Sequence, residues 1–311
     1  MYHKAYGIIE TLAPLHIGAS AGEETGNLNL IFRDQFTQTG IVPGSSIRGR
    51  FRADMRSHFG KPLVNIWYGH DSDSDEVAES SRNEQNLELE TSSKDRTTEA
   101  LVKFEYASLL WLPVFCPGQP IVWVSCHRLL KRYQQIADIH GDIPKPASEG
   151  EGEPIKHPVS LKQKCDRLFF NLGFLDNLKD TPNLKNWVPK GTNIEPDNLV
   201  VVDDADISLI HDMALYRQTR TKLEDNVKKV ESFFGFEALP EDSILIFPIA
   251  IKKALSSLEK AALAKLKQPE KWQPFDINTK QNSILYFGGL ESIGCGRCRV
   301  TLAGEYFKTA V

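Results

Sequence analysis

The sequence predicts an α+β fold. Short apolar segments with strand character are interspersed with segments whose apolar residues recur at helical spacing. Of the 311 residues, 41% are hydrophobic and 25% are charged, which is enough for one large core or for a core with insertions. The order strand, helix, strand, strand, helix, strand, with a glycine-rich loop, is compatible with a ferredoxin-like, RRM-like core.

Residues 1–126 are predicted to form four strands and one helix. Residues 5–12 carry apolar side chains at about every second position and should form a first, central strand, and residues 27–32 return to strand character. A helix is expected at 47–59 after Pro43-Gly44, because Ile47, Phe51, Met55 and Phe59 recur every four residues. Residues 101–126 then hold two apolar strands that end at Cys126.

From residue 127 onward, predicted helices and strands alternate in the same way. Residues 127–139 carry apolar residues on one helical face, and residues 254–267 are an Ala/Leu/Lys helix. Strands are expected at 199–206, which runs into three aspartates, and at 242–251, 283–287 and 299–307.

A line of arginines runs beside the apolar stripe of the helix at 47–59. Arg48, Arg52 and Arg56 are four residues apart and so share one edge, while Arg50 lies elsewhere. Like charges at this spacing destabilise an isolated helix by roughly a few tenths of a kcal/mol per pair, so their repetition indicates an anionic partner. A solvated basic face is the alternative.

The start of this helix predicts an anion site as well. Pro43-Gly44 breaks the preceding segment, and Ser45 or Ser46 can cap the helix by accepting a hydrogen bond from a free backbone N–H. Because a helix N-terminus favours anions, phosphate is the obvious partner.

A second anion site is predicted near the other end of the chain. Gly288, Gly289, Gly294 and Gly296 let backbone N–H groups approach a phosphodiester where a Cβ would collide, and Arg297 lies beside them. A dinucleotide-binding loop is excluded, because strand-like residues follow and the glycine spacing differs. A tight hairpin without a ligand is the alternative.

The net charge of −4 conceals a mildly basic body. Residues 71–99 hold ten acidic and three basic residues, so this segment carries −7 and the rest of the chain carries +3. With almost no aromatic residues, the acidic segment cannot bury enough apolar surface to order itself and is expected to be a mobile insertion.

Cysteine content and hydropathy bear on location. Five cysteines, an odd number, and no secretory leader favour reduced thiols in a cytoplasm. Cys295 and Cys298 have the spacing of half a zinc site, but no second pair accompanies them, so no metal site is predicted. No apolar run approaches the roughly 18 residues of a membrane span, so no membrane partner is expected.

Three further polar features have plain structural interpretations. His16 is expected to be partly buried and bonded to backbone rather than to act as a catalytic base. Arg33 and Asp34 are expected to form a local ion pair. The aspartates of 203–206 are expected to end a strand and cap a helix rather than to hold a metal.

Several motifs resemble those of the CRISPR RAMP superfamily. "LHIG" at Leu15–Gly18, "RD" at Arg33-Asp34 and "PGSSIRGRFR" at 43–52 are similar to its amino-terminal signature, and "GGLESIGCGRCRV" at Gly288–Val300 is similar to its glycine-rich loop. Two intermediate blocks resemble the backbone subunit of type III effector complexes, particularly type III-B: Tyr106–Cys126 and Phe233–Ser243.

The resemblance implies a single RAMP domain over residues 1–311. Its ferredoxin-like core is enlarged by insertions at about 70–100, 141–198 and 207–232, the last supplying a thumb-like hairpin that wedges between guide RNA bases. The implied function is to bind guide CRISPR RNA and present target RNA for antiviral interference. The implied partners are other type III effector subunits, including copies or paralogues of this chain, and RNA binding requires no cofactor.

The resemblance also bears on catalysis. In catalytic members, target cleavage depends on an aspartate six residues ahead of the acidic position of the R-D/E pair, and here that position is Leu28, between two asparagines. Because leucine cannot ligate Mg²⁺ or Mn²⁺, we expect this chain to hold RNA without cutting it. The alternative is a metal-dependent endoribonuclease that uses Glu23, Glu24 or Asp34. A repeat-processing ribonuclease and an RNA-binding module outside CRISPR remain rival interpretations.

Overall fold

The computed structural model describes residues 1–18, 28–69, 99–119, 121–148, 150–223, 230–275 and 281–308. The predicted acidic insertion therefore lies outside the described residues except at its C-terminal end, and Glu23 and Glu24 lie outside them entirely.

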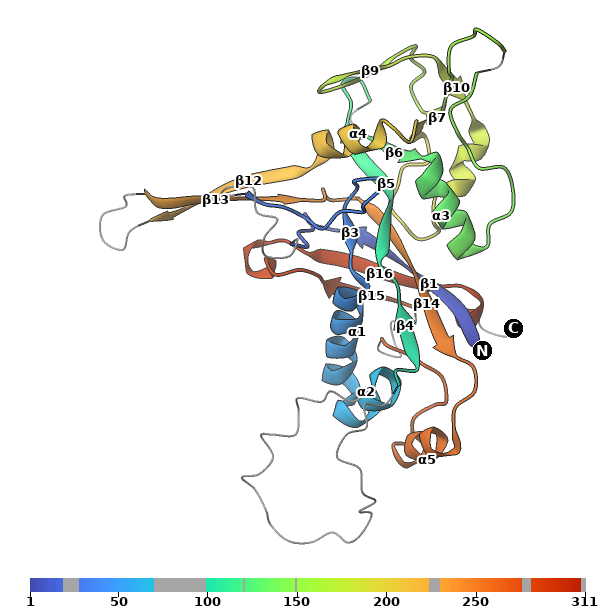
Figure 1. The fold of residues 1–311 in the computed structure, drawn as a ribbon, viewed down its shortest axis with the longest axis vertical. Helices are drawn as coiled ribbons and strands as arrows, with labels where there is room; N and C mark the ends of the chain where they lie inside the picture. The colour runs from blue at the N-terminus through green and yellow to red at the C-terminus, as the bar shows by residue number, and fades with distance from the viewer. Residues whose placement is uncertain are drawn as a thin grey trace.

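An 11-stranded sheet forms the centre of the described structure (Figure 1). Its strands are β1 (Tyr2–Thr11), β3 (Ile41–Val42), β4 (Val102–Phe104), β5 (Ala107–Phe115), β6 (Ile121–Cys126), β7 (His157–Leu161), β10 (Leu178–Asp180), β11 (Asn198–Val202), β14 (Ile244–Lys252), β15 (Asn282–Tyr286) and β16 (Arg297–Ala303). The main path runs β10-β7-β11-β6-β5-β14-β1-β16-β15, with β3 paired to β5 and β4 to β14.

The remaining elements surround this sheet. A three-stranded sheet contains β12 (Tyr216–Leu223), β13 (Val230–Ala238) and β2 (Leu28–Asn29), and a hairpin contains β8 (Leu168–Phe170) and β9 (Gly173–Leu175). The helices are α1 (Gly44–Phe59), α2 (Lys61–Tyr68), α3 (His127–Ala137), α4 (Ile207–Ala214) and α5 (Ser257–Lys265). Short 3-10 helices lie at Pro182–Trp187, Glu291–Ile293 and Glu305–Phe307.

The prediction of a central first strand is confirmed. β1 pairs antiparallel with β14 on one side and with β16 on the other, which satisfies both of its edges. Because strand side chains alternate between faces, Ile9 packs in one core and Ile8 in a second core on the opposite face.

Helices cover both faces of the sheet. The apolar stripe of α1 is buried, and the ring of Phe51 lies 6.1 Å from that of Phe247 on β14. On the other face, Tyr133 of α3 packs in the same core as Ile8. This arrangement confirms the predicted α+β class and is consistent with a ferredoxin-like core.

Several predicted boundaries were wrong. The helix expected at 47–59 begins at Gly44, and α2 was not predicted as a helix because its eight residues follow directly after Gly60. The strand expected at 27–32 is only Leu28–Asn29, and the strand expected at 199–206 ends at Val202, before its aspartates. The last strand ends at Ala303, where a 3-10 turn follows.

The hairpin of β12 and β13 projects away from the large sheet (Figure 1). It occupies the region where the sequence analysis places an extended hairpin, and α4 leads into it. Within the described ranges, no helix is both long and apolar enough to cross a bilayer.

Candidate nucleic-acid interface

The first turn of α1 differs from its prediction in one respect. Pro43 occupies the N-cap with an extended backbone (φ −57°, ψ 143°), and no side-chain cap hydrogen bond is present. Ser45 and Ser46 already lie inside the helix, so the prediction that one of them caps it was wrong. The early start depends on Gly44, because a Cβ there would lie 2.7 Å from the Phe104 carbonyl oxygen.

The arginines of α1 do not form one uniform stripe. Arg48 donates from Nη2 to the Tyr68 carbonyl oxygen at 2.6 Å and so satisfies the last residue of α2. Arg50 lies 3.7 Å from Asp54. Arg52 is half-buried and Arg56 is exposed. The exposed Arg56 is therefore the arginine of this edge that is best placed to meet a ligand.

The glycine-rich loop connects β15 to β16, and two of its glycines are required by the protein itself. At Gly288 (φ +89°) a Cβ would lie 2.1 Å from the His16 carbonyl oxygen, and at Gly296 (φ +84°) it would lie 2.1 Å from that of Phe287. At Gly289 and Gly294 a Cβ would meet nothing within 4 Å. Only these last two face open space.

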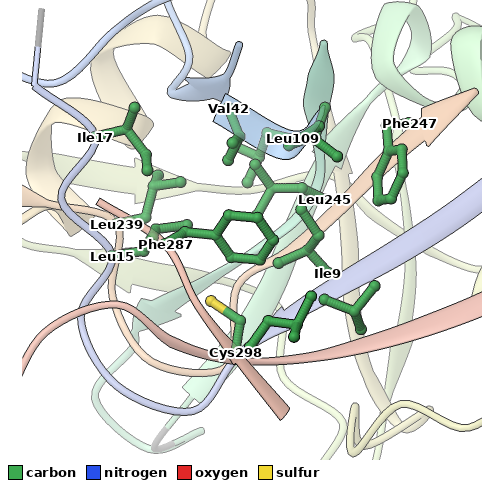
Figure 2. Packing of buried hydrophobic residues seen from close by; sticks show 14 of the residues in the cluster. Ile9, Leu15, Ile17, Val42, Leu109, Leu239, Leu245, Phe247, Phe287 and Cys298 are labelled. Carbon is green, nitrogen blue, oxygen red and sulfur yellow. The ribbon is translucent and has the colours of Figure 1, made fainter. Parts of the chain in front are cut away.

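Backbone contacts hold this loop against the segment after β1. The Gly296 N–H donates to the Pro14 carbonyl oxygen at 2.8 Å, and the exposed Arg297 donates from Nη2 to the Leu12 carbonyl oxygen at 3.2 Å. Figure 2 shows Phe287, at the start of the loop, packed among Leu15 and Leu239. The glycine-rich loop and the segment that leads into the LHIG motif are thus neighbours, although they lie near opposite ends of the sequence.

A buried charge network that the sequence analysis missed lies beside them. Glu237, 1% exposed, accepts from Arg33 Nη2 at 2.9 Å and from the Ile31 N–H at 3.2 Å. Arg33 also contacts Asp212 at 2.6 Å, and Arg217 lies 3.7 Å from Glu237. The network ties the base of the hairpin to the segment before α1.

The predicted ion pair between Arg33 and Asp34 was wrong. Neighbouring residues in extended backbone point to opposite sides, and Asp34 instead accepts hydrogen bonds from the Phe36 N–H and from the N–H and hydroxyl of Thr37. Burial acts to raise the pKa of Asp34, but these bonds outweigh it and hold that pKa below its ordinary value. Asp34 therefore organises a turn.

Two histidines are structural. His16 is 8% exposed and its Nδ1 contacts the Glu237 carbonyl oxygen at 2.7 Å, which confirms the predicted backbone-bonded role. His211 is buried, and its Nε2 accepts from the Gly40 N–H at 2.9 Å. Burial, assisted by the nearby Arg33, lowers the pKa of His211 to about 3, so the side chain is neutral at physiological pH.

The hairpin presents cationic and aromatic side chains together. The Arg220 guanidinium carbon lies 5.5 Å from the centroid of the Phe234 ring. Phe233 is 53% exposed and Tyr216 is 40% exposed. Such surfaces favour nucleic acid, because guanidinium groups contact phosphates and rings stack on bases.

Of the candidate catalytic positions, Leu28 and Asp34 lie within the described residues, whereas Glu23 and Glu24 lie outside them. Leu28 pairs with Gly235 in the parallel contact of β2 with β13, so it lies at the base of the hairpin. No group of three or more His, Cys, Asp or Glu residues suited to a metal occurs in the described part of the chain. Asp203 accepts from the Ala205 N–H just after the end of β11, as the predicted strand-end role requires. The predicted cap on the following helix was wrong, because the side chain of Asp206, at the N-cap of α4, makes no cap hydrogen bond, and Asp204 instead accepts from the Arg128 N–H in the first turn of α3.

A family model of the RAMP superfamily matches residues 8–299. The chain belongs to the RAMP superfamily. Among solved structures, this RAMP protein is similar to one described as type III-B Cmr-beta bound to cognate target RNA, with 18% identity, 96% of each chain covered and a TM-score of 0.65. It is also similar to oligomeric Cmr4 from Pyrococcus furiosus, with 15% identity, 96% and 98% covered and a TM-score of 0.61. No curated protein matches.

Proposed function

We propose that this RAMP protein is a backbone subunit of a type III RNA-guided effector complex. In this role it binds guide CRISPR RNA and presents target RNA for antiviral interference in the cytoplasm. Its partners are other effector subunits, including copies or paralogues of itself. The family membership and the similarity in fold to type III-B Cmr proteins support this proposal.

The observation that carries the proposal is the convergence of three elements around one core. Val42 before α1, Leu239 after the hairpin and Phe287 before the glycine loop pack in a single cluster (Figure 2). The base of the basic hairpin and the glycine-rich loop also pack against each other through Phe236, Ala238 and Cys295, and α1 begins two residues after Val42. Together they provide backbone N–H groups and guanidinium groups that suit an RNA backbone.

RNA binding of this kind requires no cofactor. Leu28 stands where catalytic relatives are expected to have an aspartate, so we propose that the chain does not cut target RNA. The alternative is that Glu23 or Glu24 supports cleavage with Mg²⁺ or Mn²⁺.

The number of copies bound to RNAs of different length tests the proposed function. Purified chain is mixed with single-stranded RNAs of increasing length, and the mass of each complex is measured by mass photometry. A backbone subunit adds copies stepwise as the RNA lengthens. A complex with one copy at every length would indicate an RNA-binding module of another kind and would overturn the proposal.

A further inference from the structure

A groove of about 570 Å³ lies between α3 and the turn organised by Asp34. One wall comes from this turn and from the start of β5, and the other comes from the first turns of α3. The side chains that matter for its chemistry are Phe36, Tyr106, Arg128, Lys131 and Arg132. The groove is outside the elements to which guide RNA binding is assigned above.

Two arginine–aromatic pairs line the groove. The Arg128 guanidinium carbon lies 4.9 Å from the centroid of the Phe36 ring, and that of Arg132 lies 4.2 Å from the Tyr106 ring. Arg132 is fixed further by its Nε, which donates to the Ser108 hydroxyl at 2.9 Å. Phe36 remains 72% exposed, so its ring is accessible to a ligand in the groove.

The charges in the groove are nearly balanced. Asp34 is engaged by three hydrogen bonds, Asp204 accepts from the Arg128 N–H, and Glu105 lies 3.6 Å from Arg132. Lys131 is exposed and forms no ion pair with any residue that the structure describes. The groove therefore suits a ligand with a flat π face and one phosphate better than a dense polyanion.

The position of the groove connects it to α1. Gly44, the first residue of α1, packs closely against Phe104 and Glu105, and Tyr106 is the next residue along the chain. The short segment Phe104–Tyr106 therefore links the start of α1 to the wall of the groove.

We propose that the groove binds one nucleotide of single-stranded RNA. The base extends the stack of Phe36 and Arg128, and Lys131 contacts the adjacent phosphate. The inference rests on the proposed function in one respect, namely that the RNA arrives from the start of α1.

Binding of fluorescein-labelled single-stranded RNA of twelve nucleotides to the full chain, followed by anisotropy, tests this inference. Phe36→Ala should weaken binding about tenfold, and Phe36→Trp should retain it, because stacking tolerates any large ring. Lys131→Gln should reduce the slope of log affinity against log salt by about one. The matched controls are Phe115→Ala, an exposed aromatic on β5 outside the groove, and Lys265→Gln on α5, and both should bind as the unmodified chain does.

A second measurement reports on stacking directly. RNAs that carry a single abasic residue are scanned along the twelve positions, and at one of them Phe36→Ala should cause no additional loss. Equal effects of Phe36→Ala and Phe115→Ala, or weakened subunit assembly with unchanged RNA affinity, would overturn the proposal, the latter by indicating a protein partner. Absence of RNA binding by the unmodified chain would instead count against the proposed function itself.

Discussion

At the residue scale, the Arg33–Glu237 contact decides how the hairpin is held. Both groups lie in a poorly solvated site: Arg33 is 22% exposed and Glu237 is 1% exposed. A buried charge without its partner is costly, because it has lost its hydration and gains nothing in return. The contact therefore favours one orientation of the hairpin relative to the segment before α1.

Replacing one member of this pair should destabilise the fold. We expect Arg33→Met to reduce the free energy of unfolding by about 3 kcal/mol, because Glu237 keeps its burial and loses its closest cation. Denaturant unfolding measures this, with Lys103→Met as the control, since the Lys103–Glu99 pair is exposed and should contribute little to stability. Arg33→Met/Glu237→Met should recover part of the loss. An Arg33→Met effect no larger than the control would contradict the assigned role.

His211 should make the fold sensitive to mild acid. Its pKa is lowered to about 3 in the folded chain, so below about pH 6.5 the unfolded chain binds a proton that the folded chain does not. Stability is therefore expected to fall as pH decreases from about 6.5, by up to about 1.4 kcal/mol per unit. His211→Gln, which keeps an acceptor for the Gly40 N–H, should flatten this dependence between pH 6.5 and 4.5. Parallel curves for the two proteins would show that His211 does not titrate as assigned.

At the element scale, α1 divides its arginines between folding and binding. Arg48 supports α2, so its substitution would mix a stability effect with any loss of RNA. We expect Arg52→Gln and Arg56→Gln each to reduce the salt slope of RNA binding by about one, and the change at the exposed Arg56 should leave the unfolding free energy nearly constant. Lys265→Gln, at an exposed site on α5, is the control. Unchanged slopes would show that the basic edge of α1 is a solvated face that does not contact RNA.

The glycines of the glycine-rich loop also divide into one that the fold requires and one that is free to meet a ligand. Gly288→Ala should destabilise by several kcal/mol, since its Cβ would overlap the His16 carbonyl and its φ is left-handed. Gly289→Ala should leave stability within about 0.5 kcal/mol, because its Cβ meets nothing within 4 Å. If RNA approaches this backbone, Gly289→Ala weakens RNA binding despite normal stability. Normal affinity in this variant would indicate a hairpin without a ligand.

The sequence patterns were sufficient to predict the structural features that depend on local periodicity. The four-residue spacing of Ile47, Phe51 and Met55 was sufficient to predict the buried face of α1. The turn at Asp34 could also have been predicted, since an aspartate followed three residues later by Thr37 is typical of such turns. The Arg33–Glu237 contact could not, because its partners are 204 residues apart and meet only through the tertiary fold.

At the scale of the whole molecule, we propose that the chain is a scaffold that holds RNA rather than a nuclease. Leu28 supplies no metal ligand at the base of the hairpin. With guide and complementary RNA loaded and Mg²⁺ or Mn²⁺ added, we expect no target cleavage at this subunit's position, and Leu28→Asp should introduce it. Cleavage by the unmodified chain that disappears in Glu23→Ala or Glu24→Ala would show an active endoribonuclease instead.

The most direct test of the central claim is the nucleic acid carried by the intact assembly. The chain is expressed with the products of its neighbouring genes and with a CRISPR array, the assembly is purified, and its RNA is quantified by absorbance ratio and identified by sequencing. We expect the purified assembly to contain guide RNA in proportion to the copies of this subunit. We also expect an assembly that carries Arg52→Glu and Arg56→Glu to lose that RNA. An intact assembly free of RNA, or one whose RNA is unaffected by these changes, would contradict it.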